Sequence, residues 1–366
     1  MVVADVDRAR VTRPQLRPRL AVALAVALAC AAILAFDSIA QPDAVPDFDH
    51  LWFAANAILD GRDPYQLIGP GREYNWPWLF YYPLTAPTSI LPLALLPLAI
   101  ARLLYVAIPA GLLAFLLTRD GFGRLPLFAS GAFLISVKTA QWGPLMVCSL
   151  LLPWLGAFCA AKPNLGLSTL AGARSPGALA RMMAGAGAIV LLSVAIQPEW
   201  PRRWLDVIAL APQPLSVLTL AGGPLLLLAL LRWRRWEARM LLLFALVPQT
   251  SGAVGTLPLM LVTRSFRSLT VLGILSYVPI FYAPEAGQTI EQWARRETFA
   301  TLLAVYLPVL WLILRMPNRG PLPVKLETAV ARLPEWIRGE PGPPVDPVTM
   351  DDAPMARGRA EPVTGP

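Results

Sequence analysis

The sequence predicts an all-α, polytopic transmembrane helical bundle. Hydrophobic residues make up 56% of the 366 residues and charged residues only 15%, against about 25% charged residues in soluble proteins. Apolar stretches near the length of roughly 20 residues that a helix needs to cross a bilayer recur along the chain. They lie at 20–36, 84–117, 125–137, 143–161, 178–196, 215–231, 240–262, 268–283 and 299–314. Because several are too long or too short for one pass, we expect about eight to eleven spans.

Charge and composition divide the chain into three parts. Residues 1–19 form a basic segment that we expect on the cytoplasmic side, because arginine-rich loops stay on that side. Residues 20–315 form the membrane domain. Residues 316–366 hold eleven prolines and predict a largely disordered tail, apart from a short amphipathic helix near 324–338. The net charge of +8 comes from short arginine clusters between apolar stretches, which predicts no nucleic-acid partner.

The segment 41–83 is predicted to be an outer loop. Acidic residues gather in and just before it, at Asp37, Asp43, Asp47, Asp49, Asp60, Asp63 and Glu73, against only two arginines. This balance is the reverse of that in cytoplasmic loops. The loop is also rich in Trp and Tyr, which are favoured at the membrane interface and disfavour disorder. We therefore expect interfacial helices on the outer face.

Within this loop, Asp47 and Gly61 bracket a predicted amphipathic helix. Asp is a favoured residue at the start of a helix and Gly just past its end. On a helical wheel the apolar residues share one arc, Asp49 points to solvent and Asp47 lies at the edge that faces the bundle. His50, the single histidine, lies within reach of Asp47. A carboxylate desolvated by aromatic rings suits general-base catalysis, but a capping role for Asp47 stays open.

The order of several motifs resembles glycosyltransferase family 87, which includes polyprenyl-phosphate-mannose-dependent mannosyltransferases. The motifs are DFDHLW and AILDGRDPY in 47–65, FYYPL at 80–84, LPLALLP at 91–97, QWGPL at 141–145 and AAKP at 160–163. The resemblance covers about residues 20–315. It implies a C-type glycosyltransferase fold, an outer loop with an essential acidic residue at the position of Asp47, and a lipid-linked sugar donor. It also carries over the positions of Gly61, Asp63, Pro64, Tyr65, Gln141, Lys162 and Pro163, with Ala140 in place of a glycine.

These observations predict a glycosyltransferase of the inner (plasma) membrane. It would move a mannose-type hexose from a polyprenyl phosphate to a lipid or glycan acceptor on the outer face, among membrane lipids. The predicted catalytic residues are Asp47 and His50, and the predicted substrate-binding residues are Tyr65, Tyr82, Lys138, Gln141, Lys162 and Asn164. Lys138 and Lys162 are the only lysines before residue 325, and ionisable residues within apolar spans are usually functional.

Three alternatives remain at this level. The two lysines can be snorkelling anchors. The protein can be a catalytically inactive family member that serves in assembly, because 248–269 lacks an acidic residue or histidine where a second catalytic group is expected. It can also be a transporter of lipid-linked glycans, since prolines within spans open cavities. No metal-ligand spacing or cofactor motif occurs, so we expect no metal and no cofactor besides the donor as co-substrate.

Overall fold

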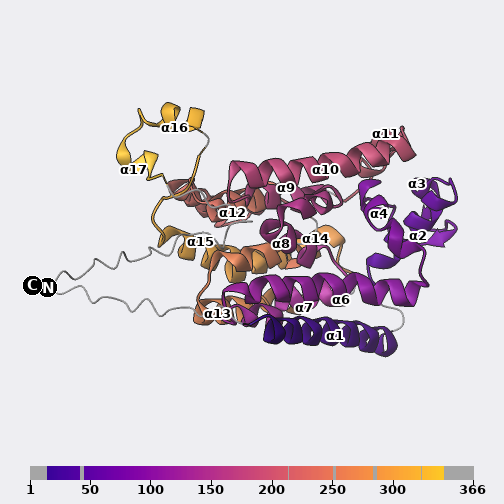
Figure 1. The fold of residues 1–366 in the computed structure, drawn as a ribbon. Coiled ribbons are helices and arrows are strands. Elements are labelled where there is room, and N and C mark those ends of the chain that lie inside the picture. Colours follow the sequence, from indigo (N-terminus) through magenta and orange to yellow (C-terminus); the bar gives the residue numbers. More distant parts are fainter. Residues whose placement is uncertain are drawn as a thin grey trace, which may run out of the picture.

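The computed structural model describes residues 15–41, 45–212, 214–249, 253–282, 287–322 and 324–341, and these are mostly helical (Figure 1). The α-helices are α1 (Leu16–Ala40), α2 (Phe48–Leu59), α3 (Pro64–Leu67), α4 (Thr85–Ser89), α5 (Leu91–Ala94), α6 (Leu98–Leu117), α7 (Gly131–Lys138), α8 (Gly143–Leu151), α9 (Pro163–Ala171), α10 (Pro176–Ile196), α11 (Trp200–Ile208), α12 (Trp236–Leu246), α13 (Phe266–Leu275), α14 (Ile290–Thr301), α15 (Leu307–Leu314), α16 (Val324–Val330) and α17 (Glu335–Arg338).

Shorter elements connect them. The 3₁₀ segments are η1 (Thr118–Asp120), η2 (Leu125–Ala129), η3 (Pro153–Ala160), η4 (Val217–Thr219), η5 (Gly223–Arg232), η6 (Ala253–Gly255), η7 (Leu257–Val262) and η8 (Val278–Phe281), and η9 (Leu302–Tyr306) is a π-helical turn. Two residues each of β1 (Ile68–Gly69) and β2 (Tyr74–Asn75) pair in parallel within the segment 41–83.

Four helices in the described part of the chain are long and apolar enough to cross a membrane. They span Leu16–Ala40, Leu98–Asp120, Pro176–Ile196 and Ile290–Leu314. A fifth candidate is the pair α7 and α8, which together meet the same criterion but are bent by 119° at the break between them. Four to five such helices indicate a multi-pass membrane protein.

This number is lower than the predicted eight to eleven spans, and the reason is proline and glycine within the apolar stretches. Proline cannot donate the helical hydrogen bond, and its ring clashes with the preceding turn. The stretch 84–117 accordingly forms two short helices, and only after Pro97 does α6 begin. The stretch 215–231 becomes η4 and η5, and η5 starts just after the left-handed Gly222 (φ 84°) with Pro224 in its first turn. Apolar length alone overestimated the number of uninterrupted helices.

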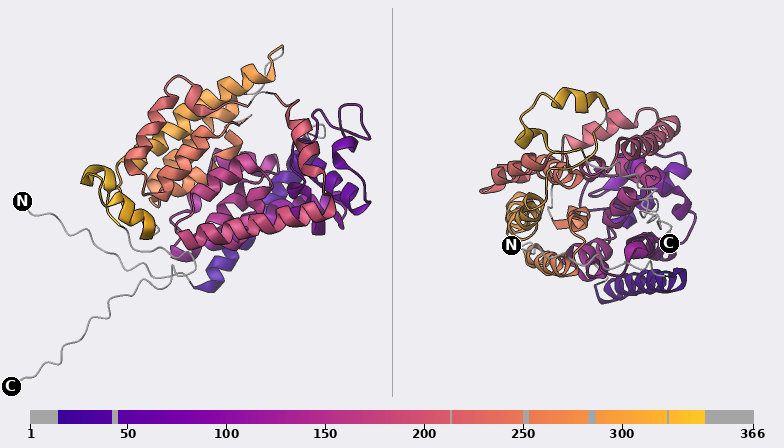
Figure 2. Two further views of the ribbon diagram at one scale, coloured as in Figure 1. Left: turned by 90° about the horizontal axis from the view of Figure 1, so that it is seen from above. Right: turned by 60° about the vertical axis from the view of Figure 1, so that its left-hand side comes forward.

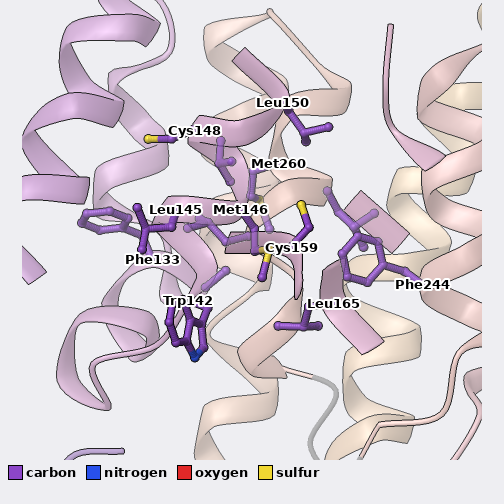
Figure 3. Close-up of a cluster of buried hydrophobic side chains, with 14 of the residues drawn as sticks. Phe133, Trp142, Leu145, Met146, Cys148, Leu150, Cys159, Leu165, Phe244 and Met260 are labelled. Carbon is purple, nitrogen blue, oxygen red and sulfur yellow. The ribbon is translucent and has the colours of Figure 1, made fainter. Parts of the chain in front are cut away.

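Small residues allow the long helices to approach closely. A Cβ atom at Gly111 of α6 would lie 3.1 Å from the Ala23 carbonyl of α1, and one at Gly156 of η3 would lie 2.3 Å from the backbone of Met182 in α10. Close backbone approach at small residues is the usual way in which membrane helices pack. Beside these contacts, side chains of α7, α8, α9, α12 and the 3₁₀ segments fill a buried core (Figure 3).

The two ends of the bundle differ. Helices α2, α3, α4 and α11 lie together at the right-hand end in Figure 1, and α16 and α17 lie at the opposite end. The further views show the same separation (Figure 2). The part of this segment that the structure describes after residue 41, 45–83, therefore covers one end of the bundle, as the prediction of a loop with surface helices requires.

Part of the predicted disordered tail is folded onto the bundle. Glu327 of α16 forms a bidentate ion pair with Arg234, with distances of 2.7 and 2.8 Å. The Trp233 indole N–H donates to the Ile337 carbonyl of α17 at 2.7 Å. The predicted short helix near 324–338 is thus present as two shorter helices, and Arg234 and Trp233 both hold them against the bundle. Residues 1–14, which are most of the predicted basic segment, and residues 342–366, the last part of the predicted tail, lie outside the described residues.

Candidate functional site

The helix predicted between Asp47 and Gly61 is present as α2, Phe48–Leu59. Gly61 follows it with φ of 68°, a left-handed conformation that glycine adopts without steric cost. The predicted helix and its ends are therefore confirmed. The predicted apolar arc is buried at Phe48, Leu51 and Ala55, but the predicted solvent-facing position of Asp49 is not found, because Asp49 is only 3% exposed.

Asp49 is buried because α6 supplies a cation for it. Arg102 donates from Nε to Asp49 Oδ1 at 2.9 Å and from Nη2 to Oδ2 at 2.5 Å. Burial raises the pKa of the Asp49 carboxyl, and the hydrogen bonds and charge of Arg102 oppose that rise. The prediction that Asp49 faces solvent is wrong, since a helical wheel contains no information about the neighbouring helix.

Asp47 holds α2 against the bundle through both its backbone and its side chain. Its N–H donates to the Thr139 carbonyl at 3.2 Å, and its carboxylate accepts a hydrogen bond from the Gln141 side-chain amide. Although Asp47 occupies the position before α2, its side chain makes no capping hydrogen bond to the helix. The side chain of Asp47 is thus directed to Gln141 and not used as a cap.

Gln141 lies in the break between α7 and α8. The backbone turns there at Ala140, whose φ of 48° is the single positive value among the described non-glycine residues. Gln141 is 7% exposed, and its side-chain oxygen accepts a hydrogen bond from Lys162 Nζ at 2.9 Å. Lys162 immediately precedes α9. We call Asp47, Gln141 and Lys162 the polar chain; it joins three segments that are distant in sequence.

Aromatic rings enclose the polar chain. Lys162 Nζ lies 5.6 Å from the centre of the Tyr82 ring, within the range of a cation–π contact. The Tyr82 ring centre lies 5.3 Å from that of His50, which also packs at 4.8 Å against Trp76. Burial raises the pKa of the Tyr82 hydroxyl well above its usual value, so this hydroxyl is protonated and able to donate.

His50 is buried and neutral. It is 4% exposed, and burial lowers its pKa to about 4, although the charge of Asp47 opposes the change. No hydrogen bond joins His50 to Asp47 in the part of the chain that the structure describes, and within that part His50 Nδ1 has no hydrogen-bond partner. The predicted support of Asp47 by His50 therefore stays a prediction, and among the described residues Gln141 provides the direct contact to Asp47.

Two aromatic residues of the site carried no signal in the sequence. Tyr105 of α6 and Trp142, which follows Gln141, pack edge to face with ring centres 5.5 Å apart. Among the described residues the Tyr105 hydroxyl has no hydrogen-bond partner. Tyr105 lies in an apolar stretch and Trp142 directly before one, where aromatic side chains are ordinary core residues, so only the fold identifies them. Trp142 is labelled at the edge of the core in Figure 3.

The remaining predicted site residues lie outside the polar chain. Lys138 Nζ forms an ion pair with Asp37 at 2.8 Å, at the end of α1. The Tyr65 hydroxyl donates to the Tyr82 backbone carbonyl at 3.2 Å, so Tyr65 positions the segment that carries Tyr82. Asn164 is half-buried, and no hydrogen bond of its side chain is found among the described residues. The structure therefore brings together Asp47, His50, Tyr82, Gln141 and Lys162 from the predicted set.

The DPY portion of the motif that ends at residue 65 has a local structural explanation. The Asp63 carboxylate caps α3 by accepting a hydrogen bond from the Tyr65 N–H at 3.0 Å, and Pro64 takes the first helical position, where its missing N–H costs nothing. Arg203 of α11 pairs with the other Asp63 oxygen at 2.5 Å. This motif builds the turn that follows α2 and fastens it to α11.

The site offers a carboxylate, a cation and hydrogen-bonding groups in a buried aromatic setting. In the described ranges, no three His, Cys, Asp or Glu side chains gather as they would around a metal ion. A half-buried carboxylate such as Asp47 can take a proton from a hydroxyl, and a lysine cation can hold a phosphate. Comparison of the chain with protein-family models, with curated proteins and with solved structures finds no match.

Proposed function

We propose that the protein is an integral-membrane glycosyltransferase. It transfers a mannose-type hexose from a polyprenyl phosphate to a hydroxyl of a lipid or glycan acceptor. The observation that carries the proposal is the polar chain, in which Gln141 donates to Asp47 and accepts from Lys162 at 2.9 Å. Asp47 and Lys162 are each half-buried, and withdrawing a carboxylate and an ammonium group from water costs free energy unless both are paired and hydrogen-bonded.

Each member of the chain has a role in the proposed reaction. The bond between the sugar C1 and the phosphate oxygen breaks, and the polyprenyl phosphate leaves with the electron pair. The acceptor oxygen forms the new bond to C1 and loses its proton to Asp47. Lys162 balances the negative charge of the leaving phosphate. Gln141 orients the Asp47 carboxylate. The side-chain oxygen of Gln141 accepts from Lys162, and this leaves the side-chain NH₂ group of Gln141 to donate to Asp47.

The resemblance to glycosyltransferase family 87 and the distribution of charge support a location of the polar chain on the outer side of the membrane. The acid-rich segment 45–83 covers the end of the bundle that carries α2 to α4, and the arginine-rich turn at Arg234 and Arg235 holds α16 at the other end (Figure 1). Arginine-rich segments stay in the cytoplasm. We accordingly place the polar chain toward the periplasm or exterior of the inner (plasma) membrane.

Lys162→Gln, with Lys138→Gln as its matched control, tests this function. The purified protein is reconstituted in liposomes and supplied with radiolabelled polyprenyl-phosphate mannose or glucose and a membrane-lipid acceptor fraction. A charge-assisted hydrogen bond contributes about 1.5–3 kcal/mol, so Lys162→Gln should lower kcat/KM for the donor by about 10–100-fold. Lys138→Gln, whose lysine pairs with Asp37, should stay within about threefold. Equal losses in the two variants would contradict the role given to Lys162.

The broken helix favours a second function, transport of a lipid-linked sugar. Gln141 lies where α7 and α8 meet at 119°, and discontinuous helices frequently form the binding sites of transporters. The same liposomes separate the two functions. A transferase leaves the label on the acceptor and releases unlabelled polyprenyl phosphate, whereas a transporter moves intact labelled donor between leaflets without consuming it. Movement of intact donor with no transfer would replace the proposal with transport.

A further inference from the structure

Arginines from five separate segments surround a cavity of about 500 Å³. Its walls include the loop after α6, the loop before α10, the turn between η5 and α12, the segment after η7 and the segment after α15. The lining arginines are Arg124, Arg174, Arg234, Arg235, Arg239, Arg264 and Arg319, and Glu237 is the single acidic residue of the lining. The cavity is next to α16, because Arg234 pairs with Glu327 of that helix, at the end of the bundle opposite α2 (Figure 1).

Some of these arginines serve the fold. Arg234 pairs with Glu327, Arg235 with Glu237 and Arg319 with Glu340. Arg239 donates to two backbone carbonyls, those of Arg234 and Ala173. These contacts account for part of the positive charge around the cavity.

The other arginines leave the cavity strongly positive. Arg124 and Arg264 form no ion pair and no hydrogen bond within the part of the chain that the structure describes, and Arg174 is only 4% exposed. Burial lowers the pKa of Arg124 and of Arg174 to about 10, and repulsion by Arg264 contributes to both changes. Arg124 and Arg174 remain charged at neutral pH, and the charge of Asp120 opposes the lowering of both pKa values. The seven lining arginines nevertheless outnumber the four acids near them, Asp120, Glu237, Glu327 and Glu340.

Orientation in the membrane does not explain this arrangement. A loop arginine that fixes topology needs only to remain on the cytoplasmic side and can stay fully hydrated. Here arginines of separate loops converge on one cavity, and two of them, Arg174 and Arg234, are almost completely buried. Convergence and burial of like charges cost free energy unless an anion compensates them.

We propose that this cavity binds a phosphate-bearing polyanion. Guanidinium groups bind phosphate oxygens in a bidentate manner, and the volume is that of sites for small molecules, about 300–1,000 Å³. Leu261, Val262 and Met316 add apolar surface to the lining for the part of the ligand that carries no charge. The phosphate belongs to a soluble diphosphate or to an anionic lipid headgroup, since basic pockets between membrane helices bind both classes.

Two binding measurements on the full chain distinguish these sources. In the first, inorganic pyrophosphate is titrated into detergent-solubilised protein, and binding is followed by calorimetry. In the second, the protein is placed in nanodiscs of phosphatidylcholine with or without phosphatidic acid, and lipid retention is followed by native mass spectrometry. Saturable binding of pyrophosphate indicates a soluble ligand, and selective retention of phosphatidic acid alone indicates a lipid.

Whichever ligand binds, the variant Arg124→Gln/Arg264→Gln should raise its Kd at least tenfold, because each lost charge-assisted contact is worth about 1.5–3 kcal/mol. Arg264→Gln alone, at an exposed position, should weaken it by a smaller factor and guards against a folding defect. Arg202→Gln/Arg295→Gln removes the same charge from exposed positions outside the cavity and should leave binding within about twofold. Absence of binding in both measurements, or equal losses in the two double variants, would overturn the proposal.

Discussion

Removing the Asp49 carboxylate should destabilise the protein strongly. Asp49→Ala deletes the acid that binds Arg102 at 2.5 and 2.9 Å, where the Asp49 side chain is 4% exposed and the Arg102 side chain 20% exposed. Breaking a fully buried ion pair by deleting one partner costs about 3–5 kcal/mol, because the remaining charge is left uncompensated. Since water still reaches Arg102, we expect the lower end of that range, about 3 kcal/mol.

The assay is a double-mutant cycle with Arg102→Met, measured by equilibrium unfolding in mixed micelles. The methionine keeps the apolar stem of the arginine and removes its charge. Each single variant leaves a buried charge without its partner, whereas the double variant leaves none. The double variant should therefore lose less stability than the sum of the two single losses, by about 2 kcal/mol. Additive losses, or a loss below about 1 kcal/mol for Asp49→Ala, would show that this pair does not hold α2 against α6.

Three further predictions concern the neighbouring structure. Ala140→Gly should leave the free energy of unfolding nearly unchanged, because relief of the left-handed φ of 48°, about 1–2 kcal/mol, offsets the lost methyl group and the added chain entropy. The control Ala114→Gly in α6 is fully buried and has no such relief, so it should cost about 1.5 kcal/mol or more. An equal cost at both positions would argue against strain at Ala140. The free energy of unfolding should decrease as the pH is lowered from 6.5 to about 4, the usual and folded-state pKa values of His50, because only the unfolded state binds the proton in that window. The total decrease is about 3 kcal/mol. His50→Gln should remove this part of the pH dependence, and an unchanged pH dependence in that variant would refute the prediction. Glu327→Gln weakens the ion pair with the fully buried Arg234, so limited proteolysis should cut the segment 316–341 faster than in the parent protein; an unchanged rate would show that other contacts suffice.

The sequence predicted those features that depend on local chemistry. Composition and apolar stretches indicated a helical membrane protein, and Asp47 and Gly61 marked the ends of α2 to within one or two residues. In glycosyltransferase family 87, which the sequence resembles, we expect a glycine at the position before Gln141, where this sequence has Ala140. Ala140 there adopts φ of 48°, the conformation that a glycine would take without strain.

Features that depend on a partner residue elsewhere in the chain could not be predicted from the sequence. A helical wheel placed Asp49 toward solvent because it could not include Arg102, which lies 53 residues away. The hydrogen bond between Gln141 and Asp47 joins residues 94 apart, and it depends on the turn at the break between α7 and α8. Lys138 and Lys162 looked alike in sequence, yet one pairs with Asp37 and the other belongs to the polar chain.

The central claim, that Asp47 acts as a general base, is tested most directly by the transfer rate of Asp47→Asn in reconstituted protein. The asparagine keeps the volume and one oxygen that can accept from Gln141, and the Asp47 side chain makes no capping hydrogen bond that could be lost. Asp60→Asn, at an exposed acid at the end of the same helix, is the matched control. We expect Asp47→Asn to fold normally and to transfer sugar about 10²–10⁴-fold more slowly, while Asp60→Asn keeps the parent rate. Transfer by folded Asp47→Asn at the parent rate would contradict the assignment.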